Sequence, residues 1–359
     1  MQVVAKFEIT YTQFLNEQGK AQTELPEFAA DADEMARMYR AMHLTRVFDQ
    51  RCINLQRTGQ VGTIASSHGH EAAQVGVAAA MEPEDVLAPS YREHGVVIWR
   101  GVRMSQLLAV WGGDERGHKW DGPQQDFPYC VPIATQCLHA AGAAMALKLR
   151  SQANCAVALC GDGATSEGAF YEALNAAGAF RLPIVFLVTN NRYAISMPVE
   201  GQTAAGTLAQ KAIAAGIPGE QVDGNDLIAV RNQAEIAMQR ARSGGGATLI
   251  EALSYRLADH TTADDASRYR PDDEVETARR HAPLNRTKKF MQERFGWTDE
   301  QEQALIEELE AEVEAEVDAY LSVPRPAITE IFEHQFANMP DSLKAQREIA
   351  RKYPVPDHG

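Results

Sequence analysis

Two apolar segments in the middle of the chain, each followed by a short polar loop, constrain the fold more than any other feature. Residues 155–160 read CAVALC and residues 183–188 read PIVFLV. Segments of this length and composition are typical of strands that are buried on both faces. Residues 169–180, which lie between them, are expected to form a helix. A strand–helix–strand unit of this kind predicts a parallel sheet with helices packed against its faces.

The polar loops after these two strands predict a site for a metal ion and a diphosphate. The first strand runs into GDG at residues 161–163, just before a helix, and the second runs into TNN at residues 189–191. Ligands of open parallel sheets bind beyond the carboxyl ends of the strands, where a helix N-terminus also favours phosphate. Asp162 and Asn191 are therefore expected to meet. With a backbone carbonyl they would leave half of an octahedral shell to diphosphate oxygens, which suits Mg²⁺.

The remaining segments extend the same α/β pattern. Apolar or small residues at helical spacing predict helices over 31–58, 70–80, 93–99, 105–111, 135–149, 226–242 and 301–317. Short strands are expected within 85–91, 219–224 and 247–253. Residues 112–132 predict a long loop with a role at a site or an interface. The expected organisation is an N-terminal arm (1–30), a main domain (31–300) and a C-terminal helical tail (301–359) packed on that domain or on a partner.

The composition favours a cytoplasmic protein that binds neither nucleic acid nor membranes. Acidic residues outnumber basic ones by 49 to 34, which gives a net charge of −15. The chain has no apolar run of the ~18 residues that a membrane span requires, and its start does not resemble a signal peptide. An odd number of cysteines without CxxC spacing predicts reduced thiols rather than a disulfide framework or a zinc site. The five are Cys52, Cys130, Cys137, Cys155 and Cys160.

The combination of motifs resembles a known family. GDG followed about thirty residues later by NN is the diphosphate-binding motif of thiamine-diphosphate enzymes. The segment 161–196 closely resembles the alpha subunits of pyruvate and branched-chain 2-oxoacid dehydrogenases; it reads GDGATSEGAFYEALNAAGAFRLPIVFLVTNNRYAIS. The resemblance extends from about Arg40 to Tyr353. It implies a thiamine-diphosphate-binding fold, with a mostly parallel sheet flanked by helices. It also implies Mg²⁺ held by Asp162, Asn191 and the carbonyl of Tyr193, and cofactor contacts from Gly161, Gly163 and Ala164.

Three further segments fit this resemblance. Tyr91 and Arg92 match a Tyr-Arg pair that would bind the cofactor, with Arg92 donating to the diphosphate. Val131 and Ile133 fall in the loop that meets the aminopyrimidine ring, where a bulky apolar side chain imposes the bent cofactor shape. In branched-chain members this loop holds K⁺, for which Pro132, Thr135 and Gln136 are the candidates here.

The resemblance makes His260 the catalytic candidate. It lies in ADHTTADD (258–265), which follows a strand end and is similar to the family's active-site loop. In the family this histidine binds cofactor and assists acyl transfer. An imidazole can do this by stabilising developing negative charge or by moving a proton.

The implied enzyme is incomplete as a single chain. The family's activating glutamate lies on a second α/β domain, and nothing after the first domain of this chain provides one. The resemblance therefore implies a heterotetramer of two alpha and two beta chains that decarboxylates a 2-oxoacid and transfers the acyl group to the lipoyl groups of an acyltransferase core. Residues 56–73 and the N-terminal region favour pyruvate as the substrate, and a branched-chain 2-oxoacid is the alternative.

Two other classes of protein fit the sequence less well. A dinucleotide-dependent oxidoreductase needs G-x-G-x-x-G and an acidic residue after the next strand. GDGATSEG (161–168) lacks the third glycine at the required place, and the next strand ends in Asn-Asn. A non-catalytic subunit that only retains the fold is disfavoured by the presence of Asp162, Asn191 and His260.

Overall fold

The computed structural model describes residues 1–353, so the last six residues of the predicted C-terminal tail (354–359) lie outside the described range. The chain divides into two compact units, residues 1–317 and 318–359. The predicted domain boundaries near residues 30 and 300 stay a prediction. In its described part the second unit contains two short helices, α13 (Glu330–Glu333) and α14 (Asp341–Ala350).

A six-stranded, fully parallel sheet forms the centre of the first unit, as the sequence predicts, and the expected fold class is confirmed. The spatial order of the strands is β1-β7-β8-β4-β3-β2. A two-stranded antiparallel sheet, β5 (Tyr193–Ala194) and β6 (Met197–Pro198), follows β4. The bounds in the main sheet are β1 (Thr10–Thr12), β2 (Val86–Ala88), β3 (Ala156–Gly161), β4 (Ile184–Asn190), β7 (Gly219–Asp223) and β8 (Thr248–Leu253).

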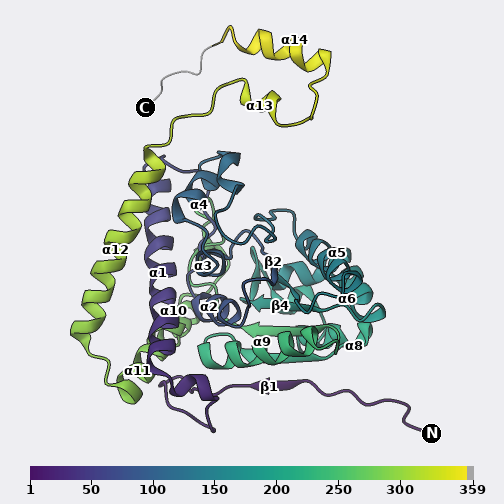
Figure 1. The fold of residues 1–359 in the computed structure, drawn as a ribbon. Helices are drawn as coiled ribbons and strands as arrows, with labels where there is room; N and C mark the ends of the chain where they lie inside the picture. The colour runs from purple at the N-terminus through teal and green to yellow at the C-terminus, as the bar shows by residue number, and fades with distance from the viewer. Residues whose placement is uncertain (354–359) are drawn as a thin grey trace. The chain divides into compact units, whose positions relative to one another are not determined.

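Helices cover both faces of this sheet (Figure 1). The step from β3 to β4 and the step from β7 to β8 run in opposite directions along the sheet. Because parallel crossovers are right-handed, the connecting helices α6 and α9 must lie on opposite faces. The helices of the first unit are α1 (Ala32–Arg57), α2 (Glu71–Ala79), α3 (His94–Trp99), α4 (Met104–Trp111), α5 (Thr135–Leu149), α6 (Gly168–Ala179), α7 (Val199–Gln202), α8 (Lys211–Ala215), α9 (Leu227–Arg242), α10 (Asp272–Arg280), α11 (Pro283–Phe295) and α12 (Asp299–Leu321), the last of which ends just past the unit boundary.

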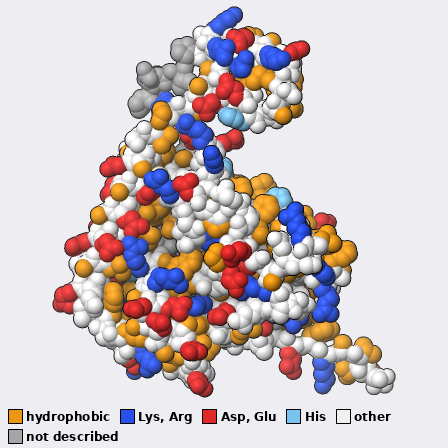
Figure 2. All heavy atoms as spheres, viewed as in Figure 1, with side chains coloured by type: hydrophobic (Ala, Val, Ile, Leu, Met, Phe, Trp, Pro, Cys, Tyr) orange, Lys and Arg blue, Asp and Glu red, His pale blue; other side chains and the backbone are white. Residues whose placement is uncertain are grey.

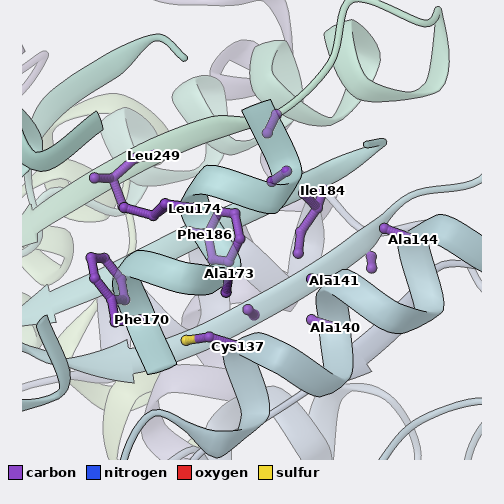
Figure 3. Close-up of a cluster of buried hydrophobic side chains, with 14 of the residues drawn as sticks. Cys137, Ala140, Ala141, Ala144, Phe170, Ala173, Leu174, Ile184, Phe186 and Leu249 are labelled. Carbon is purple, nitrogen blue, oxygen red and sulfur yellow. The ribbon is translucent and has the colours of Figure 1, made fainter. Parts of the chain in front are cut away.

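The core on the α5–α6 face is built from small residues on the helices and large ones on the strands. Ala140 and Ala144 of α5 are fully buried, and they pack in one cluster with Phe170 of α6 and with Ile184 and Phe186 of β4 (Figure 3). Alanines allow a helix backbone to approach its neighbour closely, and the phenylalanines fill the remaining volume. This packing fixes β3 and β4 side by side, so the loops at their ends are held together.

The long helices α1 and α12 run alongside each other on the left of Figure 1. Tyr39 of α1 donates its hydroxyl proton to the buried Glu302 carboxylate at 2.9 Å, and Trp297 donates to the same group at 2.9 Å. Arg51 forms an ion pair with Glu314 nearby. Acidic and basic side chains are interspersed along this pair of helices in Figure 2. The Glu-rich helix predicted over 301–317 therefore belongs to a packed surface layer.

The predicted N-terminal arm contains an edge strand that the sequence did not indicate. β1 pairs with β7, and the chain after it is fixed by the buried Asp226. The Asp226 carboxylate accepts hydrogen bonds from the backbone N–H groups of Phe14 and Leu15 at 2.7 and 2.6 Å, and it also caps α9. Three residues are too few for a period-two pattern to be recognisable, so this pairing depends on tertiary contacts.

The carboxyl ends of the central strands all lie at one edge of the sheet. Gly161 at the end of β3 is in register with Thr189 of β4, and Asn190 is in register with Leu253 of β8. The loops after β2, β3, β4 and β8 therefore meet at this edge, where parallel sheets place their ligands. Among the described residues, no helix is long and apolar enough to cross a membrane.

Candidate functional site

A pocket opens where these loops meet, and it brings together most of the residues predicted to form a site. Its walls come from residues 90–93, 161–167, 189–195 and 256–260, with His70, Cys130 and two side chains near the start of α5. The predicted cofactor-binding and metal-binding residues that line it are Tyr91, Arg92, Ile133, Gly161, Asp162, Gly163, Ala164, Asn191, Tyr193 and His260. Val131 is not among them, and its side chain is exposed to solvent.

Three oxygens converge at the ends of β3 and β4. The side-chain oxygen of Asn191 lies 3.3 Å from Oδ1 of Asp162 and 3.1 Å from the carbonyl oxygen of Tyr193. Facing oxygens with no proton between them repel each other. They are stable together if a cation lies among them, or if the amide turns so that its nitrogen donates to the other two. This set fits a hard cation, because Mg²⁺ prefers oxygen ligands.

The donor set of this chain is small, which leaves room for ligands from a second molecule. Among residues 1–353 there is no group of three His, Cys, Asp or Glu side chains that could hold a metal. One carboxylate, one amide and one carbonyl supply at most half of an octahedral shell. A diphosphate could complete such a shell, as Mg²⁺ usually shares its coordination with substrate phosphates.

The Asp162 carboxyl is buried and held by neutral donors. Gln202 Nε2 donates to its Oδ2 at 2.7 Å, and the backbone N–H of Asn191 donates to its Oδ1 at 3.3 Å. Burial raises the pKa of Asp162, while the bonds from Gln202 and Asn191 and the charge of Arg256 act in the opposite direction. A bound divalent cation would favour the ionised form of this carboxyl.

The backbone around these oxygens is closely fitted. A Cβ at Gly163 would lie 2.8 Å from the Cβ of Ala194, so only glycine fits without a shift of the β5 segment. Arg192 and Ile195 both have positive φ, at 78° and 55°. Such conformations each cost roughly 1 kcal/mol or more in non-glycine residues and tend to persist at functional sites. They turn the chain after β4 so that the Tyr193 carbonyl points towards Asn191.

A cluster of two guanidinium groups and one imidazole forms another wall of the pocket. Arg92 Nη2 lies 3.2 Å from His260 Nδ1 and donates to the His260 carbonyl at 2.9 Å, while Arg256 Nη1 lies 3.4 Å from the same Nδ1. Arg256 is almost fully buried, and its Nη1 also donates to the Tyr193 carbonyl at 3.0 Å. The cluster offers a positive environment to an anion beside the oxygens described above.

This environment determines the protonation state of His260 and which ring nitrogen carries the proton. Burial, followed by the charges of Arg92 and Arg256, lowers the pKa of His260 to about 4, so the ring is neutral at physiological pH. Guanidinium groups can only donate, and both approach Nδ1, so Nδ1 is the acceptor and Nε2 carries the proton. The ring of Tyr91 meets the imidazole edge-to-face at 6.4 Å. His260 is therefore a neutral ring whose Nε2–H is available as a donor.

The loop before α5 presents apolar and polar groups to the same pocket. Ile133 lines the pocket and is 46% exposed, so part of its side chain is free to contact another molecule. Gln136 also lines it and donates from Nε2 to the Leu159 carbonyl at 2.9 Å, while its buried Oε1 has no hydrogen-bond partner among the described residues. Pro132 and Thr135 are not pocket-lining residues.

Several residues at this site were missed by the sequence interpretation. Arg256 could have been suspected, because it lies four positions before His260 and shortly after the end of β8 at Leu253. Glu93, whose pKa burial raises to about 7, follows the Tyr-Arg pair and was not singled out. His70, which lines the pocket, and Gln202, which donates to Asp162 from outside the lining, had no local signal, because only the fold brings them to these positions.

Comparison with known proteins agrees with this geometry. The family model described as "Dehydrogenase E1 component" matches residues 39–329. The chain is 43% identical, over 88% of its length and 86% of the relative, to the 3-methyl-2-oxobutanoate dehydrogenase subunit alpha of Mycobacterium tuberculosis. It is 38% identical to the pyruvate dehydrogenase E1 component subunit alpha of Bacillus cereus, over 98% of the chain and 94% of the relative. The corresponding subunit of Bacillus subtilis is also 38% identical, over 94% and 91%.

The resemblance found in the sequence is thereby confirmed, since the match covers well over half of the chain and the relatives are similar over nearly their whole length. The chain belongs to the dehydrogenase E1 component family, the thiamine-diphosphate-dependent 2-oxoacid dehydrogenases.

Proposed function

We propose that this chain is the alpha subunit of a pyruvate dehydrogenase (acetyl-transferring), which decarboxylates pyruvate and passes the acetyl group to lipoyl groups of an acyltransferase core. The observation that carries the proposal is the convergence of Asp162, Asn191 and the Tyr193 carbonyl, in a chain similar to pyruvate dehydrogenase alpha subunits over almost its full length. Thiamine diphosphate, when bound, supplies an electron sink for the loss of carbon dioxide.

The converging oxygens are proposed to hold Mg²⁺. Asp162 supplies a carboxylate, Asn191 an amide oxygen and Tyr193 a carbonyl oxygen. Arg256 donates to the Tyr193 carbonyl and thereby fixes its direction. The metal would be shared between these ligands and the diphosphate.

The diphosphate is proposed to lie between the GDG loop (161–163) and the pocket wall that Arg92, Arg256 and His260 form. Gly161, Gly163 and Ala164 line the pocket on one side, and the lack of side chains on the two glycines lets the backbone approach phosphate oxygens. Arg92 supplies the charge, and Tyr91 would supply a hydroxyl.

The opposite end of the cofactor is proposed to contact the loop before α5. The half-exposed Ile133 would support its bent shape, and Val131 would contact the ring or the partner subunit. The unpartnered Oε1 of Gln136 is the observation that supports a K⁺ site, with the Pro132 carbonyl and the Thr135 hydroxyl as further ligands.

His260 is proposed to act in acyl transfer. Its neutral ring keeps Nε2–H available as a donor to an oxygen that becomes negatively charged, while the Arg92 and Arg256 contacts on Nδ1 hold the ring in place. A preorganised donor of this kind stabilises developing charge without reorganisation.

Members of this family act with a beta subunit, and the surface supports such a partner. Two exposed apolar side chains, Ile133 and Ile195, line the pocket, and segments that contribute to it also carry the exposed Val131, Leu138, Tyr171 and Met197. Hydrophobic side chains also gather along α5 and α6 in Figure 2. Exposed apolar groups of this kind mark an interface. We propose an assembly of two alpha and two beta chains in which the beta subunit supplies the activating glutamate.

All five cysteines are free, which supports a reducing, cytoplasmic setting.

The substrate is tested by supplying the alpha–beta complex with pyruvate and, separately, with 3-methyl-2-oxobutanoate. We expect kcat/KM for pyruvate to exceed that for the branched acid by roughly tenfold or more. A pocket fitted to one side chain lowers kcat/KM by about this factor for a substrate whose apolar group differs even slightly in size. Carbon dioxide release with an artificial electron acceptor measures both. A preference for the branched acid would assign the chain to the other branch of the family.

A further inference from the structure

A buried lysine lies behind the loop that carries Asp162. Lys211 is the first residue of α8 and is only 7% exposed. Its Nζ donates to the carbonyl of Thr165 at 2.6 Å and to the Thr165 hydroxyl at 2.8 Å. The Tyr171 ring lies 5.3 Å from the ammonium. Within residues 1–353 no carboxylate forms an ion pair with Lys211. The Thr165 oxygens and the Tyr171 ring are therefore the partners that the structure shows for this ammonium.

The contact with Thr165 continues to the proposed metal ligand. The Thr165 hydroxyl, which is fully buried, donates to the backbone carbonyl of Asp162 at 2.7 Å. An ammonium can only donate, so Lys211 makes the Thr165 oxygen an acceptor and leaves its proton for Asp162. The lysine therefore sets the direction of the hydrogen bond that closes the turn over residues 162–166.

Lys211 acts on this turn from outside the pocket. Asp162, Gly163 and Ala164 line the pocket, whereas Thr165 and Lys211 are not among the described residues that do. The segment that carries Lys211 is anchored to the sheet, because the N–H of Ala209 donates to Glu251 at 3.1 Å. Lys211 thus contacts the turn through Thr165 and not through the residues that line the pocket.

We propose that Lys211 is a positioning residue for the diphosphate and metal site. Its hydrogen bonds to Thr165, which in turn donates to the Asp162 carbonyl, hold the turn over 162–166 in the shape that presents Asp162, Gly163 and Ala164. This inference rests on the proposed function and assigns to that site a residue that does not touch the ligand.

The test measures binding of Mg²⁺–thiamine diphosphate to the alpha–beta complex by calorimetry, for wild type, Lys211→Met and Lys211→Arg. Loss of a buried charged hydrogen bond should weaken binding about tenfold or more. Lys211→Arg should recover most of the affinity because it restores the charge and the donors. Mg²⁺ with inorganic pyrophosphate serves as a second probe and should show the same order. Lys148→Met is the matched control, because Lys148 also donates to a carbonyl, that of Phe180, but on an exposed surface.

Specific outcomes would overturn the inference. One is a Lys211→Met complex that binds within about twofold of wild type, and another is an arginine variant as weak as the methionine variant. If Lys211→Met fails to assemble, Thr165→Val against Thr165→Ser tests the same link: the serine, which keeps the hydroxyl, should bind more tightly, and equal affinities would overturn the inference. A wild-type complex that binds no Mg²⁺–thiamine diphosphate would instead overturn the proposed function.

Discussion

Replacing Asp162 with alanine is expected to reduce the affinity of the alpha–beta complex for Mg²⁺–thiamine diphosphate by at least about a hundredfold. Asp162 is the only carboxylate among the three converging oxygens, so its removal leaves two neutral ligands for a divalent cation. Gln202 would also lose the acceptor of its 2.7 Å hydrogen bond. Calorimetric titration of the cofactor at fixed Mg²⁺ measures the effect directly, and pyruvate decarboxylation should fall in parallel.

Two variants control for this substitution. Asp162→Asn keeps the shape and one oxygen but removes the charge, and it should bind more weakly than wild type and more tightly than Asp162→Ala. Asp121→Ala removes an exposed carboxylate in the loop before α5 and should leave the affinity unchanged. An Asp162→Ala complex that binds Mg²⁺–thiamine diphosphate with wild-type affinity would contradict the proposed metal site.

Replacing His260 with alanine is expected to separate the two halves of the reaction. Acetyl transfer to a lipoyl domain should fall roughly a hundredfold or more, the usual contribution of a positioned imidazole. Carbon dioxide release with an artificial electron acceptor should fall less, because the Asp162 side of the site is untouched. Measuring both rates on the same preparation gives the ratio. His281→Ala removes a partly exposed histidine that pairs with Glu17 and does not line the pocket, and it should change neither rate.

The protonation state of His260 adds a pH criterion to this prediction. With a pKa of about 4, the imidazole stays neutral from pH 5 upwards, so acetyl transfer should show no inflection near the usual histidine value of about 6.5 from this group. Equal losses in both rates for His260→Ala would remove the specific role in acyl transfer and leave a general role in cofactor binding.

The central part of the site was predictable because its signals are local. CAVALC and PIVFLV are buried strands, and parallel neighbours must bring their carboxyl ends together, so Asp162 and Asn191 could be paired from sequence alone. The resemblance then placed Tyr91, Arg92, Ile133 and His260, and all four line the pocket.

The remaining features depend on contacts between distant segments. β1 is an edge strand of three residues that is fixed by Asp226, and no periodic pattern identifies it. Helices α10 and α11 carry many charged residues and were not predicted, although α11 buries Leu284, Phe290 and Met291 on one face. Gln202 and Lys211 reach the site from segments after β4, and their roles follow only from side-chain directions that the three-dimensional fold determines.

The most direct test compares pyruvate-dependent release of carbon dioxide by the alpha chain alone, the beta subunit alone and the two together, each with Mg²⁺ and thiamine diphosphate. The pocket of this chain is proposed to supply the metal ligands, Arg92 and His260, and the partner is proposed to supply the activating glutamate. We therefore expect activity only in the mixture, with neither chain active by itself. Turnover by the alpha chain alone at a rate close to that of the mixture would contradict it.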